Sequence, residues 1–256
     1  MAARIATLDG VRFAPETVLV LPLGAHEQHG NHLPLDTDTI IAEAVADRLI
    51  ARLGDGPVLA LPAEPVGYSP EHMDWSGTRS LPYAEAIERW CALGARAAAA
   101  GCRRMLLLNA HGGNAPLIAI CAQELRRRAG MLCVATAWTR HGDPAAIVGE
   151  REKLFGIHGG AIETAVMLAV ASERVGEGAD HRSLQEDLAE RFTHLRAYGP
   201  HAFGWLMQDL NPAGTVGDAR MATAAMGERL LDGAVEGLAE LCREMQLFDL
   251  DHLRAR

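Results

Sequence analysis

The sequence has few cysteines and lacks the closely spaced cysteine pair of a thiolate metal site. Its five cysteines are odd in number, lie far apart and sit among apolar or helix-forming residues, and none belongs to a C-x-x-C pair. This pattern predicts reduced core residues and the cytoplasm as the compartment. It disfavours a small secreted domain held by disulfides and a closed structural zinc site rich in cysteine.

Long apolar runs and basic clusters are also scarce. No uninterrupted apolar segment approaches the roughly 20 residues that span a bilayer, and the first residues lack the apolar stretch of a signal sequence. The formal net charge is −9, and the densest basic patch is the short run Arg126-Arg127-Arg128. We therefore expect neither a membrane nor a nucleic acid as partner.

Short aliphatic runs alternate with longer segments of helical periodicity along the chain. The spacing predicts a single α/β domain over residues 1–256, with a mostly parallel sheet flanked by helices on both faces. The predicted strands are residues 17–21, 58–61, 104–108 and 132–136, and the predicted helices are residues 38–53, 83–100, 115–129 and 219–245.

A dense group of possible metal ligands, residues 24–38, begins where the first predicted strand ends. Alternate side chains of an extended backbone point the same way, so Glu27 and His29 are expected to face one site together. Asp38, at the start of the next helix, can fold back over that site, and its two oxygens suit a bridge between two cations. Asp36 is the alternative for the bridging position.

Two further histidine motifs lie later in the chain. His111 stands in N-A-H-G-G-N, directly after a predicted strand, and His158 and Glu163 stand in H-G-G-A-I-E-T at a loop-to-helix junction. Ligands of open α/β sheets gather at the carboxyl ends of strands, so these motifs are expected near the first one. Mixed oxygen and nitrogen ligands suit zinc, manganese or iron.

With these motifs in view, the sequence resembles the creatininase family of metal-dependent amidohydrolases, whose E-x-H-G, later aspartate, H-G-G-N and H-x-G-x-x-E-T segments are present. The resemblance implies two divalent metal ions. Glu27 and His111 would bind one of them, His29 the other, and Asp38 would bridge them. Glu163 would complete the second metal shell. It also implies a homo-oligomer, commonly a hexamer.

Departures from the family pattern bear on the substrate. Creatininases carry H-Y-E-N where this chain has His111-Gly112-Gly113-Asn114, and residues 154–157 replace a segment with a substrate-covering tryptophan. Creatinine is thereby disfavoured as substrate. The H-G-G-N form resembles formamide hydrolases and peptide-trimming enzymes of the same family.

The resulting hypothesis is an amidohydrolase that cleaves the C–N bond of a cyclic amide, formamide or small amide with a water activated by two metals. His158, which would protonate the leaving nitrogen, and Glu163 are the candidate catalytic residues. The candidate substrate-binding residues are His72, Ser76 and Thr78. The loop 198–217, with His201, Phe203, Trp205 and Asn211, could reach the site of a neighbouring subunit in an oligomer. Alternatives are a peptide-trimming metallopeptidase, a non-catalytic metal-binding scaffold and, ranked last, a phosphoester hydrolase.

Overall fold

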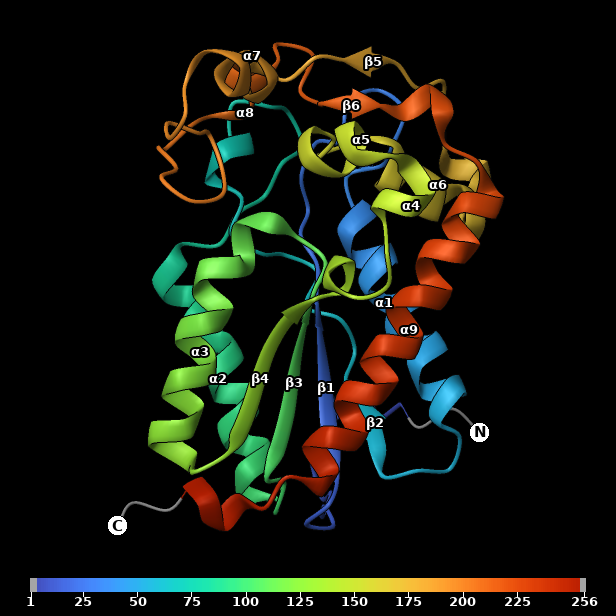
Figure 1. The fold of residues 1–256 in the computed structure, drawn as a ribbon. Helices are drawn as coiled ribbons and strands as arrows, with labels where there is room; N and C mark the ends of the chain where they lie inside the picture. The colour runs from blue at the N-terminus through green and yellow to red at the C-terminus, as the bar shows by residue number, and fades with distance from the viewer. Residues whose placement is uncertain (1–3, 254–256) are drawn as a thin grey trace.

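A parallel sheet of four strands forms the centre of the computed structural model, which describes residues 4–253 (Figure 1). The strand order is β2-β1-β3-β4, and Leu23 at the end of β1 lies opposite Asn109 at the end of β3. The predicted strands and the α/β fold class are confirmed. The strands are β1 (Val18–Leu23), β2 (Val58–Ala60), β3 (Arg104–Asn109) and β4 (Leu132–Ala137).

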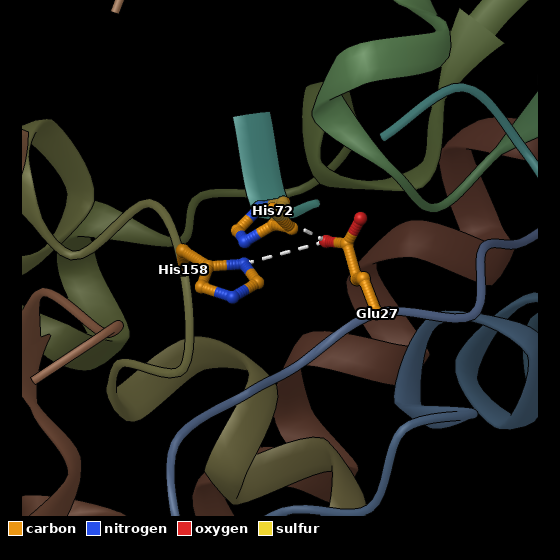
Figure 2. Close-up of side chains that lie close together, drawn as sticks. All are labelled: Glu27, His72 and His158. Atoms are coloured by element: carbon orange, nitrogen blue, oxygen red, sulfur yellow. Dashed lines mark ion pairs between the residues drawn. The ribbon is translucent and has the colours of Figure 1, made fainter. Parts of the chain in front are cut away.

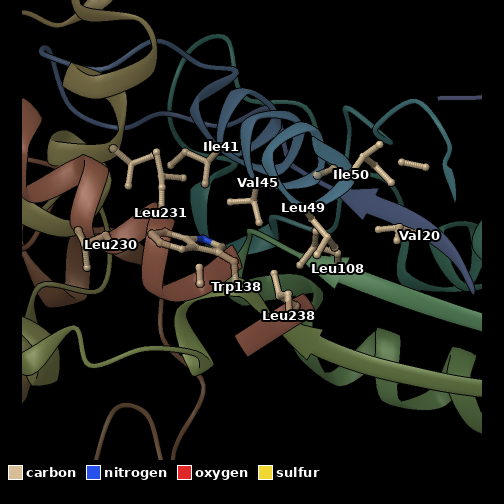
Figure 3. Packing of buried hydrophobic residues seen from close by; sticks show 14 of the residues in the cluster. Val20, Ile41, Val45, Leu49, Ile50, Leu108, Trp138, Leu230, Leu231 and Leu238 are labelled. Carbon is tan, nitrogen blue, oxygen red and sulfur yellow. The ribbon is translucent and has the colours of Figure 1, made fainter. Parts of the chain in front are cut away.

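Helices cover both faces of the sheet, as predicted. α1 (Thr37–Leu53) and α9 (Ala224–Leu247) pack on one face, and α2 (Tyr83–Ala99) and α3 (Ala115–Ala129) pack on the other (Figure 1). Successive strand residues face opposite sides, so the core has two parts. Val18, Val20, Leu106 and Leu108 pack with α1 and α9, as Figure 3 shows in part, whereas Leu19, Leu21, Met105 and Leu107 pack with α2 and α3.

A cap of short elements lies above the carboxyl ends of the strands (Figure 1). The sequence patterns did not predict most of it, because each element is too short to show a clear period. Its helices are α4 (Ala145–Val148), α5 (Glu150–Phe155), α6 (Ala161–Val170), α7 (Leu184–Arg191) and α8 (Met207–Leu210), and its antiparallel strands are β5 (Asp180–His181) and β6 (Gly217–Asp218). His158 and Gly214 of this cap contact the motif that follows β1: the His158 ring donates to the Gln28 carbonyl at 2.7 Å, and the Gln28 side chain donates to the Gly214 carbonyl at 2.6 Å.

The terminal helix begins later than predicted. Residues Ala219–Met221 form a 3-10 turn, and α9 starts at Ala224 because the Thr223 hydroxyl accepts a hydrogen bond from the Met226 amide, which caps the helix. The five cysteines are free thiols, as expected. No helix within residues 4–253 is long and apolar enough to cross a membrane.

Candidate metal centre

The carboxyl edge of the sheet brings the first motif and α1 together. Glu27 and His29 follow β1 and are completely buried, and Asp38, in the first turn of α1, is 1% exposed. The Nε2 atom of His29 lies 3.5 Å from Asp38 Oδ1. Glu27 and His29 thus point into one interior site, as the sequence led us to expect.

Asp38 lies between two histidines. Its Oδ1 faces His29, and its Oδ2 lies 3.4 Å from Nδ1 of His111, the residue two positions after β3. His111 Nδ1 is also 3.1 Å from Glu27 Oε1, and Glu163 Oε2 from α6 lies 3.8 Å from His29 Nε2. All five predicted metal ligands thus meet in one cluster. Asp36, the alternative bridge, instead forms an ion pair with Arg174 on the surface.

Several buried polar atoms of this cluster have no hydrogen-bond partner in the described part of the chain. They are both carboxylate oxygens of Glu27, His29 Nε2 and Asp38 Oδ2. Buried polar atoms are nearly always satisfied, and an unpaired buried carboxylate is costly. Ligand atoms of Glu27, His29 and Asp38, or of His29, His158 and Glu163, lie close enough together to share a cation. This donor set fits divalent metal ions.

The far nitrogen of each cluster histidine is already hydrogen-bonded to a backbone carbonyl. His29 Nδ1 donates to the Glu27 carbonyl at 3.1 Å, and His111 Nε2 donates to the Tyr68 carbonyl at 2.9 Å. Such bonds fix the tautomer, so that the other ring nitrogen presents its lone pair to the site. His29 and His111 are therefore oriented as metal ligands.

His158 follows the same rule. Its Nε2 donates to the Gln28 carbonyl at 2.7 Å, which leaves Nδ1 unprotonated and 3.6 Å from Glu27 Oε1 (Figure 2). Burial, with the nearby rings of His29 and His72, lowers the pKa of His158 well below its usual value. This imidazole is thus neutral, with an open lone pair toward the cluster.

His72 presents an N–H where the other histidines present a lone pair. The Gln28 amide nitrogen donates to His72 Nδ1 at 2.9 Å and to the Gly214 carbonyl at 2.6 Å. The proton of His72 therefore resides on Nε2, which lies 3.4 Å from Glu27 Oε1. Burial lowers the pKa of His72 to about 4, so the ring is neutral. The protonated Nε2 of His72 therefore faces the Glu27 carboxylate without a hydrogen bond to it.

Electrostatics in the metal-free cluster favour protonated histidines. Burial works against the charged form of His29, but Asp38, Glu163 and Glu27 outweigh it and raise the pKa of His29 to about 10. Burial likewise opposes the charge on His111, and Glu27, Asp38 and Glu71 raise its pKa to about 10. Without metal, the protons on His29 and His111 therefore balance the carboxylate charge that a bound cation would balance.

Two cavities of about 320 Å³ each meet at the cluster, and both are lined by His111, Gly112, Ile157 and Glu163. The first cavity extends toward Trp138, Pro144 and Lys153. The second extends toward His72, Tyr198 and Trp205, so residues of the loop 198–217 line the site of their own chain.

Only one of the three predicted substrate-binding residues lines a cavity. His72 lines the second cavity, but Ser76 is exposed and Thr78 uses its hydroxyl to accept a hydrogen bond from the Gln28 amide. Neither Ser76 nor Thr78 lines the two cavities. Sequence reasoning missed the roles of Gln28 and Glu71, although their positions beside Glu27, His29 and His72 were a usable signal.

Comparisons with known proteins identify the family of this chain. A family model described as creatinine amidohydrolase matches residues 8–242. The mycofactocin precursor peptide peptidase of Mycolicibacterium smegmatis is 33% identical, covering 90% of this chain and 85% of the relative. The creatinine amidohydrolase of Pseudomonas putida is 31% identical, covering 90% of both. A solved structure named "Creatininase Mn" superposes with a TM-score of 0.70 at 28% identity, over 90% of this chain and 91% of that one. The chain therefore belongs to the creatininase family of hydrolases.

Proposed function

We propose that this protein is a metal-dependent amidohydrolase that holds two divalent metal ions, zinc, manganese or iron. Glu27 and His111 would hold one ion, His29 and Glu163 the other, and Asp38 would contact both. The observation that carries the proposal is the set of four buried, partnerless ligand atoms on Glu27, His29 and Asp38. When bound, such a metal pair lowers the pKa of water and polarises a carbonyl oxygen.

The protein's own contribution to proton transfer is assigned to His158. Its Nδ1 is held unprotonated by the bond from Nε2 to the Gln28 carbonyl. This nitrogen would accept the proton of the attacking water and pass it to the leaving nitrogen as the C–N bond breaks. A positioned acid–base group of this kind contributes about 10²–10⁴-fold to the rate. His72 would present its Nε2–H toward Glu27 Oε1, 3.4 Å away.

A peptide-like substrate is the second, narrower proposal. The two cavities share His111, Gly112, Ile157 and Glu163 and otherwise have different walls, so together they suit an amide with groups on both sides of the scissile bond. A small ring such as creatinine would occupy one of them. The peptidase name of the relative from M. smegmatis points in the same direction.

The family resemblance also supports a homo-oligomer, which analytical ultracentrifugation would test. We further propose that residues 1–256 act as one domain and that the protein works in the cytoplasm. The alternative of a non-catalytic metal-binding scaffold makes a different prediction for the same purified protein, because it binds metal and hydrolyses nothing.

The deciding experiment is to purify the protein without chelator and to measure metal per chain together with hydrolysis of creatinine, N-formyl amines and short blocked peptides. We expect about two metal ions per chain and turnover of the linear amides above that of creatinine. Metal binding without hydrolysis would support the scaffold alternative. A protein that takes up no metal after metal-replete preparation would refute the proposal.

A further inference from the structure

Lys153 is the only lysine in the chain, against 23 arginines. It belongs to α5 and lines the first cavity. Its ammonium has no ion pair or hydrogen bond within residues 4–253. Arg151 on the same short helix shows the contrast, because it pairs with Glu186 at 3.0 Å and with Asp180 at 3.3 Å. Lys153 therefore carries an uncompensated positive charge beside the cavity.

The rest of the first cavity is mainly apolar. Its wall includes Ala110, Ala137, Trp138, Pro144, Ile157 and Ile162. The other ionisable side chains of the wall, His111 and Glu163, belong to the metal centre. A ligand in this cavity therefore meets the metal centre, an apolar surface and one ammonium group. These are the features of a site that orients a mostly apolar ligand by a few polar contacts.

The backbone beneath Lys153 is anchored to the metal centre. The preceding residue, Glu152, is buried, and its Oε1 accepts a hydrogen bond from the Ala161 amide at 2.6 Å while its Oε2 accepts one from the Asp218 amide at 2.9 Å. Ala161 begins α6, which carries Glu163. The Glu152 carboxylate thus ties α5 to the helix that supplies a metal ligand, and the Lys153 side chain extends from a fixed point.

We propose that Lys153 binds a carboxylate of the substrate, so that the preferred substrate is an amide whose apolar part fills the first cavity and ends in an anion, such as the carboxyl-terminal residue of a peptide. This inference rests on the proposed amidohydrolase function. Lys153 is the ionisable residue of this cavity wall that does not belong to the metal centre, so an anionic group at that end of the cavity would pair with its ammonium.

The kinetic test uses acetylglycylphenylalanine and its carboxamide, which differ only in the terminal charge. Wild-type protein is expected to prefer the carboxylate, measured as the ratio of the two kcat/KM values for cleavage of the Gly–Phe bond. K153M should lower that ratio about 10- to 100-fold, chiefly through KM, because a charge-assisted hydrogen bond is lost. K153R keeps the charge and should restore most of the preference. An unchanged ratio in K153M would overturn the assignment.

A binding test separates this inference from the proposed function. Because the chain has one lysine, an amine-reactive reagent labels Lys153 and the chain's own amino terminus, which peptide mapping distinguishes. Acetylglycylphenylalanine at millimolar concentration should slow labelling of Lys153, and the carboxamide should not. If neither compound is hydrolysed but the carboxylate alone protects, the carboxylate site stands and the hydrolytic proposal fails for this pair. Equal protection by both, or by neither, would refute the role of Lys153.

Discussion

Glu71 Oε1 lies 2.8 Å from the point at which a Cβ on Gly113 would stand. The same Cβ would collide with the Tyr68 carbonyl and with Nε2 of His111. Glu71 therefore reaches toward the metal centre only because residue 113 has no side chain. The family pattern H-Y-E-N has a glutamate at that position, whereas this chain has a glycine there with the Glu71 carboxylate beside it.

Gly113→Ala should consequently damage the site. Overpacking at a filled position costs about 1–3 kcal/mol of unfolding free energy, and displacement of His111 should lower metal affinity. Gly112→Ala is the matched control, because a Cβ there meets no atom within 4 Å. Urea unfolding and metal titration of both variants provide the measurement. If the two variants have the same unfolding free energy and metal affinity, a side chain at residue 113 fits without displacing its neighbours.

The two neighbouring aspartates should differ sharply on substitution. Asp38→Asn removes the charge between His29 and His111, and we expect loss of metal together with loss of activity. Asp36→Asn breaks a surface ion pair with Arg174, which is worth about 0–1 kcal/mol, and should leave metal content unchanged. Metal analysis of the two purified variants tests the assignment. Full metal content in Asp38→Asn would exclude Asp38 as a ligand.

Metal binding should release protons, because His29 and His111 must be neutral to act as ligands. Their pKa values are raised to about 10 in the metal-free cluster, so near pH 7.5 about two protons are displaced, and metal affinity rises with pH until about 10. Calorimetric titrations in buffers of different ionisation enthalpy count these protons. Absence of proton release would mean that the histidines are already neutral without metal.

The folding stability of the metal-free protein should depend on the same histidine protons. It should fall as the pH rises, whereas the metal affinity should increase. The folded state holds these histidine protons more tightly than the unfolded chain, whose histidines have a pKa near 6.5. Their contribution to stability is therefore complete below pH 6.5 and is lost as the pH rises toward 10. Chemical denaturation across this range, with chelator present, measures the effect. Bound metal should reduce this pH dependence of the folding stability.

Gln28→Glu should reverse the tautomer of His72. The amide nitrogen that donates to His72 Nδ1 would become an acceptor, so the histidine proton would move to Nδ1. Loss of such a supporting contact around a metal site costs about 10–100-fold in affinity or activity. The ¹⁵N chemical shifts of His72 report the tautomer directly. Gln185→Glu is a suitable control, since this buried glutamine accepts a hydrogen bond from the Ala197 amide in another part of the molecule.

Glu152→Ala should destabilise the cap. The change leaves the amides of Ala161 and Asp218 without their acceptor, and each buried unsatisfied group costs about 1–3 kcal/mol. We expect a lower melting temperature and weaker metal binding, because α6 carries Glu163. Glu150→Ala, an exposed position on the same helix, should stay within about 0.5 kcal/mol of wild type. If both variants melt alike, Glu152 does not anchor the cap.

Local patterns in the chain were sufficient for the sheet, its four covering helices and the placement of the ligand motifs. Apolar periodicity reports which face of a segment is buried, and the motifs after β1 and β3 had to meet because parallel strands end at the same edge. The segment around Glu27 and His29 was expected to be extended because it directly follows a predicted strand. These inferences depend on neighbours a few residues away.

Contacts between distant segments needed the folded molecule. The choice between Asp36 and Asp38 depends on where Arg174 lies. The tautomers of His72 and His158 depend on the side-chain amide and the carbonyl of Gln28, which is 44 and 130 residues away from them. The cap, the start of α9 and the free ammonium of Lys153 beside the cavity are likewise products of packing. Such contacts have no period along the chain, because they arise where loops of a large fold close over the edge of its sheet.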